Sequence, residues 1–170
     1  MKQMLIVRKH QSGVGLLEVL ISLVVIAVGL IGLATLQTAS LKEVQATRYQ
    51  QQANELLSDL VQRVLSQPAA AKNGYFDYDL LNGGVLPVVA APGATVQSKA
   101  EYDRYQWYQR LTGTLPNPRF KILTQSVSGV SGKFVQINMT WDAALKGVGA
   151  ANCDGANSSY ICQNLSLWVP

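Results

Sequence analysis

Histidine is almost absent from this sequence, and cysteine is scarce. The chain has one histidine, His10, and two cysteines in 170 residues. No serine or cysteine stands in a motif with a possible base, and the closely spaced carboxylates Asp77 and Asp79 are typical of a solvated loop. The sequence therefore predicts a protein that is not an enzyme, with no metal and no cofactor. No small-molecule substrate is evident.

An excess of positive charge is also missing from most of the chain. Three of the 14 basic residues, Lys2, Arg8 and Lys9, lie in residues 1–13, which contain no acidic residue. The remaining 11 basic residues face 10 acidic ones, a net charge of +1. Because no stripe of lysine and arginine with interleaved aromatic residues remains, no nucleic-acid partner is evident.

Strongly polar residues are rare between Val14 and Leu36, where only Glu18, Ser22 and Thr35 interrupt an apolar run. A helix of this length measures roughly 35 Å, enough to cross the hydrocarbon core of a bilayer. The basic residues before it favour a cytoplasmic N-terminus. We therefore predict a single-pass anchor in the inner membrane, with everything after Leu36 on the periplasmic side.

The two cysteines, Cys153 and Cys162, enclose eight residues. An oxidising compartment favours a disulfide between them, whereas two thiols without further ligands cannot complete a tetrahedral metal site. We predict a Cys153–Cys162 disulfide that closes part of the long connection after Trp141.

Proline and glycine are absent from residues 34–66, and apolar residues there recur at intervals of three and four, as in an amphipathic helix. One helix is predicted from Val14 to Ser66, ended by Pro68 and then by Asn73-Gly74. It would be roughly 75–80 Å long. Since one small domain cannot cover such a length, its first half should protrude from the globular part. The apolar residues expected on the amphipathic stripe are Leu41, Val44, Leu56, Leu57, Leu60, Val61, Val64 and Leu65.

The remaining residues predict loops, a second helix and a sheet. A short extended piece is expected at residues 85–89. Ser98 followed by Glu101 fits a capping box and favours a helix to about Leu111, with a strand through residues 105–111 as the alternative. Alternation of apolar and polar residues predicts strands at 120–126, at 133–141 and around Leu165 to Val169. Three antiparallel strands could then cover the amphipathic half of the long helix, which makes the fold class α+β.

The basic leader ends at Gly13, and a carboxylate, Glu18, follows five residues later inside the apolar run. A secretory signal is cut after its apolar segment, whereas a cut at Gly13 would leave that segment on the mature chain. Glycine suits such a cut because it leaves the scissile backbone unhindered.

These residues resemble the class III signal of type IV prepilins, and the match extends through Val28 to Gln37. That stretch, together with residues 55–68 and the cysteine-bearing C-terminal region, looks like the PilV-type minor pilins, also called type IV pilus modification proteins. The resemblance implies a type IV pilin-like fold and four segments. These are a leader (1–13), a transmembrane and assembly half of the helix (14–36), an amphipathic half (37–67) and a globular periplasmic domain (68–170).

The resemblance also implies roles for individual residues. A prepilin peptidase would cut between Gly13 and Val14 and would methylate the new N-terminus at Val14. Glu18 would attract the terminal amine of a neighbouring subunit, while the simpler interpretation leaves it at the level of the lipid headgroups. Relatives usually begin with Phe, where this chain has Val14. Major pilins usually have a proline where this chain has Thr35, which favours a minor subunit.

Three functions fit these observations. The first is a minor pilin in the fibre or in a tip complex that initiates assembly, in contact with major and minor pilins and with the inner-membrane assembly platform. Before assembly the protein would lie in the inner membrane, and after assembly in the pilus, where it could contribute to cell adhesion. The second is a minor pseudopilin of a type II secretion system. The third is an unprocessed, membrane-anchored periplasmic binding module. Gly29 and Gly32 could serve either local flexibility or close helix packing.

Overall fold

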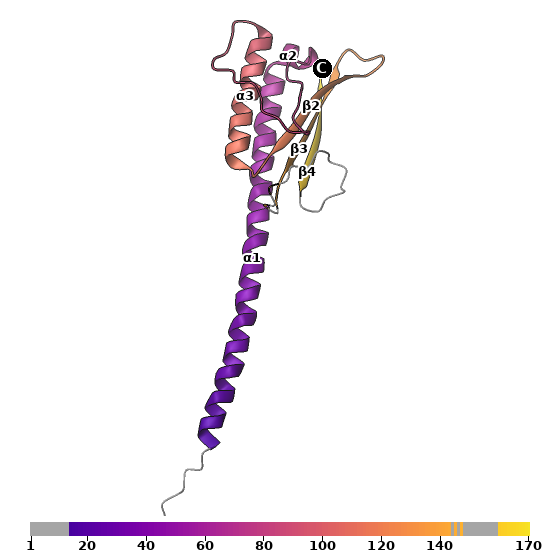
Figure 1. Cartoon of the computed structure of the whole chain (residues 1–170). Helices are drawn as coiled ribbons and strands as arrows, with labels where there is room; N and C mark the ends of the chain where they lie inside the picture. The colour runs from indigo at the N-terminus through magenta and orange to yellow at the C-terminus, as the bar shows by residue number, and fades with distance from the viewer. Residues whose placement is uncertain (1–13, 144, 146, 148–159) are drawn as a thin grey trace, which may run out of the picture. The chain divides into compact units, whose positions relative to one another are not determined.

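The computed structural model describes residues 14–143, 145, 147 and 160–170 (Figure 1). Its first element is the helix α1, Val14–Ser66, of 53 residues. The predicted bounds of this helix are confirmed. The chain divides into two compact units, residues 1–45 and 46–170, so that α1 contributes its first part to one unit and its last part to the other.

The second unit adds two helices and four strands (Figure 1). The helices are α2, Pro68–Lys72, and α3, Val96–Thr114. The strands are β1, Tyr78–Asp79; β2, Arg119–Ser126; β3, Lys133–Trp141; and β4, Ile161–Val169. The strands form one antiparallel sheet in the order β1-β2-β3-β4. The α+β prediction is therefore correct, with one more strand than expected.

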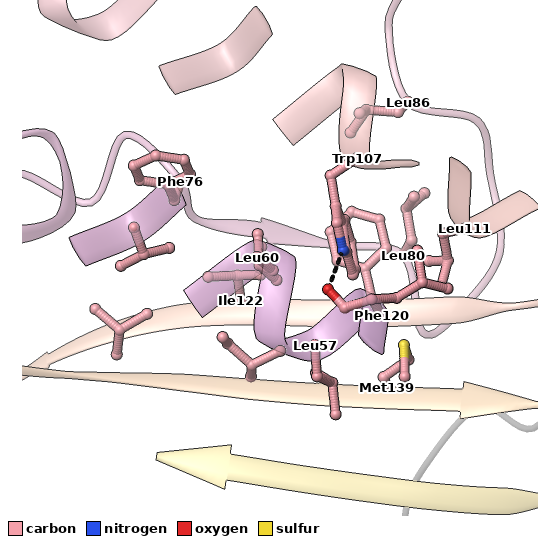
Figure 2. Close-up of a cluster of buried hydrophobic side chains, with 14 of the residues drawn as sticks. Leu57, Leu60, Phe76, Leu80, Leu86, Trp107, Leu111, Phe120, Ile122 and Met139 are labelled. Carbon is pink, nitrogen blue, oxygen red and sulfur yellow. Dashed lines mark hydrogen bonds between the residues drawn. The ribbon is translucent and has the colours of Figure 1, made fainter. Parts of the chain in front are cut away.

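The core of the second unit lies between the helices and one face of this sheet (Figure 2). On β3 the predicted alternation is confirmed, because Val135, Ile137, Met139 and Trp141 are all fully buried. From the helices, Leu60 and Trp107 are fully buried, and the Trp107 ring meets the Phe120 ring edge-on with centroids 5.0 Å apart. The indole Nε1 donates a hydrogen bond of 2.8 Å to the Leu56 carbonyl, which satisfies the polar atom of this large side chain.

The amphipathic stripe of α1 is shorter than the sequence predicts. Its buried residues begin at Ala53 and continue through Leu57 and Leu60 to Val64. Leu41 and Val44, which the periodicity places on the same stripe, are 63% and 61% exposed. Periodicity indicates which residues share a helix face but not where the covering elements begin.

Helix α3 corrects the predicted capping box. The N-cap is Thr95, whose side chain accepts from the Ser98 N–H while the Ser98 hydroxyl accepts from the Thr95 N–H. Glu101, the expected partner of Ser98, instead accepts a hydrogen bond from Gln97. The box therefore lies one turn earlier than predicted. The alternative strand at 105–111 is wrong, because this segment lies within α3.

The chain between α1 and α3 contains short elements that the sequence does not predict. Helix α1 ends at Ser66, just before Pro68, as predicted. Pro68 itself stands in the first turn of α2, where its missing N–H costs no hydrogen bond. Residues 85–89 form no strand, and the short strand β1 occurs earlier, at Tyr78–Asp79. Arg104 steadies the chain before β1 by donating to the carbonyls of Tyr75 and Asp77. Burial lowers the pKa of this guanidinium, which is 8% exposed.

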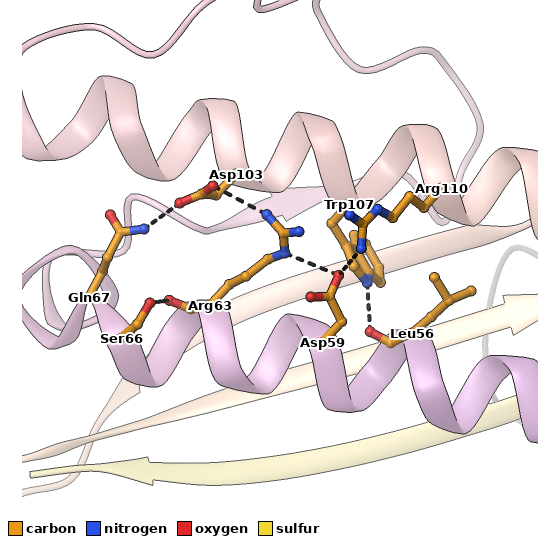
Figure 3. Close-up of polar contacts among 8 residues, drawn as sticks. All are labelled: Leu56, Asp59, Arg63, Ser66, Gln67, Asp103, Trp107 and Arg110. Carbon is orange, nitrogen blue, oxygen red and sulfur yellow. Dashed lines mark hydrogen bonds and ion pairs between the residues drawn. The ribbon is translucent and has the colours of Figure 1, made fainter.

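Polar contacts join α1 to α3 along one side of the core (Figure 3). Arg63 is the centre of this network, with its Nε 3.1 Å from the Asp59 carboxylate and its Nη1 3.2 Å from that of Asp103. The Gln67 amide also donates to Asp103, and Arg110 lies 3.4 Å from Asp59. Such half-exposed pairs stabilise weakly, so they add little to the packing of α1 against α3.

Candidate assembly helix

The N-terminal part of α1 presents its apolar side chains without cover from the described chain. Every large apolar residue from Leu16 to Leu36 is between 56% and 74% exposed. The most apolar 18-residue window has a mean hydropathy of 2.8, and none of it is buried. By length and composition, this is the one helix among the described residues that could cross a membrane. Exposure on this scale indicates a segment made for lipid or for other protein chains.

The hydroxyl groups of this segment are bonded to the helix itself. Ser22 donates to the Glu18 carbonyl at 2.8 Å, and Thr35 donates to the Gly32 carbonyl at 2.7 Å. These bonds satisfy both hydroxyls inside an apolar environment. The Glu18 carboxylate has no such bond to any described residue, and it is the one charged side chain between Val14 and Leu36. An ionised group in this position needs a partner from outside the helix.

Small residues and Glu18 share one face of the helix. Successive residues of an α-helix turn by 100°, so Gly15, Glu18, Ser22, Gly29 and Gly32 fall within an arc of roughly 100°. An added Cβ at Gly15, Gly29 or Gly32 would meet no other atom within 4 Å. This face therefore leaves room for another helix to approach closely beside the carboxylate. This stripe extends beyond the predicted pair Gly29 and Gly32, although its spacing of three, four, seven and three residues is visible in the sequence.

Neither Gly29 nor Gly32 ends or interrupts a helix. Helix α1 continues without interruption through both glycines and through Thr35. Local flexibility and close packing of the helix both stay predictions for these two glycines.

The remaining predicted site residues fall partly outside the described chain. Gly13 and Cys153 lie outside the described residues, and Val14 is the first residue of α1. Cys162 lies in β4 opposite Thr140 of β3. The cleavage site, the methylation and the disulfide remain predictions. Glu18 and Cys162 belong to different compact units.

A comparison with protein families identifies the class of this N-terminal segment. The prokaryotic N-terminal methylation motif matches residues 8–34, which include the expected cleavage site, Glu18 and both glycines. No curated protein and no solved structure matches the chain.

The motif and the fold together support a type IV pilin-like protein. The long N-terminal helix and the four-stranded antiparallel sheet form a pilin-like α+β arrangement. The motif further implies processing by a prepilin peptidase and assembly with other pilins, which is a structural, non-enzymatic function. The motif and the apolar helix also fit anchoring in a membrane and later incorporation into a pilus.

Proposed function

We propose that this chain is a minor pilin of a type IV pilus, of the PilV type, which takes part in initiating the fibre as a member of a tip complex. Before assembly it crosses the inner membrane once, with its N-terminus in the cytoplasm and its second compact unit in the periplasm. The continuous helix at Thr35 supports a minor rather than a major subunit, because major pilins of the resembled family carry a bending proline there.

The processing step is proposed at the end of the leader. Prepilin peptidase cuts between Gly13 and Val14 and methylates Val14, and the predicted Cys153–Cys162 disulfide forms in the periplasm. The match of the methylation motif to residues 8–34 supports this cut. Gly13→Phe should trap the precursor, because a bulky side chain hinders the scissile backbone, and Gly15→Ala should be cut normally, because it leaves Gly13 in place. Mass spectrometry of the N-terminal peptide measures both; a wild-type start at Val14 is expected, and an intact Met1 would contradict the proposal.

The observation that carries the proposed function is the lone carboxylate on an exposed apolar helix. Once the leader is removed, the terminal amine of a neighbouring subunit supplies the charge that Glu18 lacks within its own chain. Attraction of unit charges is strong in an apolar environment, and loss of one partner of a buried pair costs roughly 3 kcal/mol or more. The carboxylate would thereby guide the subunit into the growing fibre.

The test replaces this carboxylate and counts the chain in sheared pili. Glu18→Gln keeps the size of the side chain and removes its charge, and incorporation should fall by about tenfold or more. Glu55→Gln is the matched control, since Glu55 is an exposed carboxylate in the second compact unit. The membrane-bound amount of both variants should equal that of the wild type. Normal incorporation of Glu18→Gln would overturn the pairing.

The pseudopilin alternative is separated by deleting the chain. Loss of surface pili with normal protein secretion is the expected result, whereas loss of type II secretion with normal pili would assign the chain to the secretion system.

A further inference from the structure

The two edges of the sheet are protected very differently. The first edge strand, β1, has only two residues, and Asp79 forms an ion pair of 2.8 Å with Lys121 of β2. A very short edge strand with charged side chains discourages pairing with another chain. Beyond β1, the Phe120 carbonyl of β2 accepts from the Leu80 N–H and the Thr124 N–H donates to the Asp77 carboxylate. Most of this edge is therefore closed to further strands.

The opposite edge, β4, lacks those protections. It is nine residues long, and its sequence from Ile161 to Val169 contains no charged residue, no proline and no glycine. It pairs with β3 on one side, and no described strand pairs with its other side. A strand in this position directs a row of backbone N–H and C=O groups away from the sheet. These groups match another extended backbone and no other class of ligand so well.

The side chains of β4 specify the character of that additional strand. Leu165 lies opposite Ile137 in the register, so it belongs to the core face of the sheet, yet it is 36% exposed while Ile137 is fully buried. On the other face Asn164 and Ser166 are exposed, and Trp168 packs on Phe134 near the end of the strand. An added strand with an apolar residue beside Leu165 and polar residues beside Asn164 and Ser166 would extend both surfaces.

We propose that β4 accepts an amphipathic extended segment from a different pilus subunit as a fifth strand of the sheet. This inference rests on the proposed pilin function. A second copy of the chain could pair only through its own β4, because most of its other edge is closed. Such a twofold pair would use both open edges and could not extend along a fibre.

The test is photo-crosslinking of the full chain in piliated cells, with a photoreactive amino acid placed at Asn164 or at Ser166. Both positions should attach to one extended segment of another pilus subunit. Because strands repeat every two residues, moving the probe by two positions should move the attached residue by two. Gln125, exposed on the outer face of β2, is the control position and should not reach that segment.

Several results would overturn the proposal. These are adducts between two copies of this chain, attachment without the shift of two residues, or no adduct from either β4 position. The N-terminus and the pilus content are measured in the same cells. Normal processing and incorporation without the two-residue shift would defeat the strand pairing alone. An uncut precursor would defeat the proposed function, while the presence or absence of the shift still decides the pairing.

A matched pair of substitutions sharpens this test. Leu165→Lys places a charge on the open edge, and Leu123→Lys places one on the inner strand β2 at almost equal exposure, 36% against 37%. The adduct from the Ser166 probe should fall about tenfold in Leu165→Lys, which corresponds to ~1.4 kcal/mol, and should persist in Leu123→Lys. Circular dichroism checks the fold, and Asn164→Lys replaces Leu165→Lys if the latter unfolds. Equal adducts in the edge and control variants would contradict the proposal.

Discussion

The two parts of helix α1 contain the same kinds of apolar residue but differ in how far these side chains are exposed. From Leu16 to Leu36 these side chains are 56–74% exposed, whereas Leu56, Leu57, Leu60 and Val64 are at most 9% exposed. Each part belongs to a different compact unit. A single helix can therefore hold one segment that stabilises its own domain and another whose apolar surface is available to lipid or to neighbouring chains.

The largest expected effect is on the free energy of unfolding, and it should distinguish a buried leucine from an exposed one. Leu60→Ala should lower the free energy of unfolding of the second unit by ~3 kcal/mol, because it leaves a cavity in the core. Leu20, which is 56% exposed, is the matched control, and Leu20→Ala should change that free energy by less than ~0.5 kcal/mol. Denaturant titration of the detergent-solubilised full chain, followed by the near-ultraviolet signal of the buried Trp107 and Trp141, measures both. Equal losses would show that the first segment also supports the domain.

A smaller loss of stability is expected from replacing a threonine, and it should again depend on whether the threonine lies in the second unit or in the exposed segment. Thr95→Ala removes the N-cap of α3 and should cost ~1 kcal/mol of unfolding free energy. Thr35→Ala removes only a hydroxyl bonded to its own helix, at Gly32, and should change the stability of the second unit by less than ~0.5 kcal/mol. Thermal unfolding compares the two variants with the wild type. A stability loss from Thr35→Ala equal to that from Thr95→Ala would break the distinction between the segments.

Local sequence patterns predict some of these elements and not others. The bounds of α1 and the buried face of β3 follow from local patterns, namely a run without proline or glycine and a strict alternation. The position of the cap does not, because Ser98 with Glu101 and Thr95 with Ser98 both offer suitable side chains at the same spacing. Only the first turn of the actual helix decides between them.

Other features depend on contacts between distant parts of the chain. Strand β1 is held by the pairing of Asp79 with Lys121 and by a hydrogen bond from the Leu80 N–H to the Phe120 carbonyl. No local sequence pattern predicts these contacts. For the candidate site, the isolated position of Glu18 in an apolar helix could be predicted from the sequence, and the leader stays a prediction. The open edge of β4 could not, since it depends on the order of the strands.

The smallest expected effect concerns pH and acts on the second unit alone. The ion pair with Lys121 lowers the pKa of Asp79 below its ordinary value. Its contribution to stability is therefore complete above about pH 4 and is lost as the pH falls through the lowered pKa. Solvent screens this exposed pair, so the contribution should be less than ~1 kcal/mol.

Stability measured from pH 6 down to pH 2 in wild type and Asp79→Asn tests this. The difference between the two proteins should shrink toward the acid end. A constant difference would contradict a role for the charge.

The hydroxyl groups of Ser22 and Thr35 donate to carbonyls of their own helix, so donor and acceptor move together. Transfer of this segment from a lipid bilayer to a protein fibre therefore neither makes nor breaks these hydrogen bonds. The electrostatic difference between the two surroundings is concentrated on one side chain, Glu18, so a single nearby positive charge can set the direction of transfer.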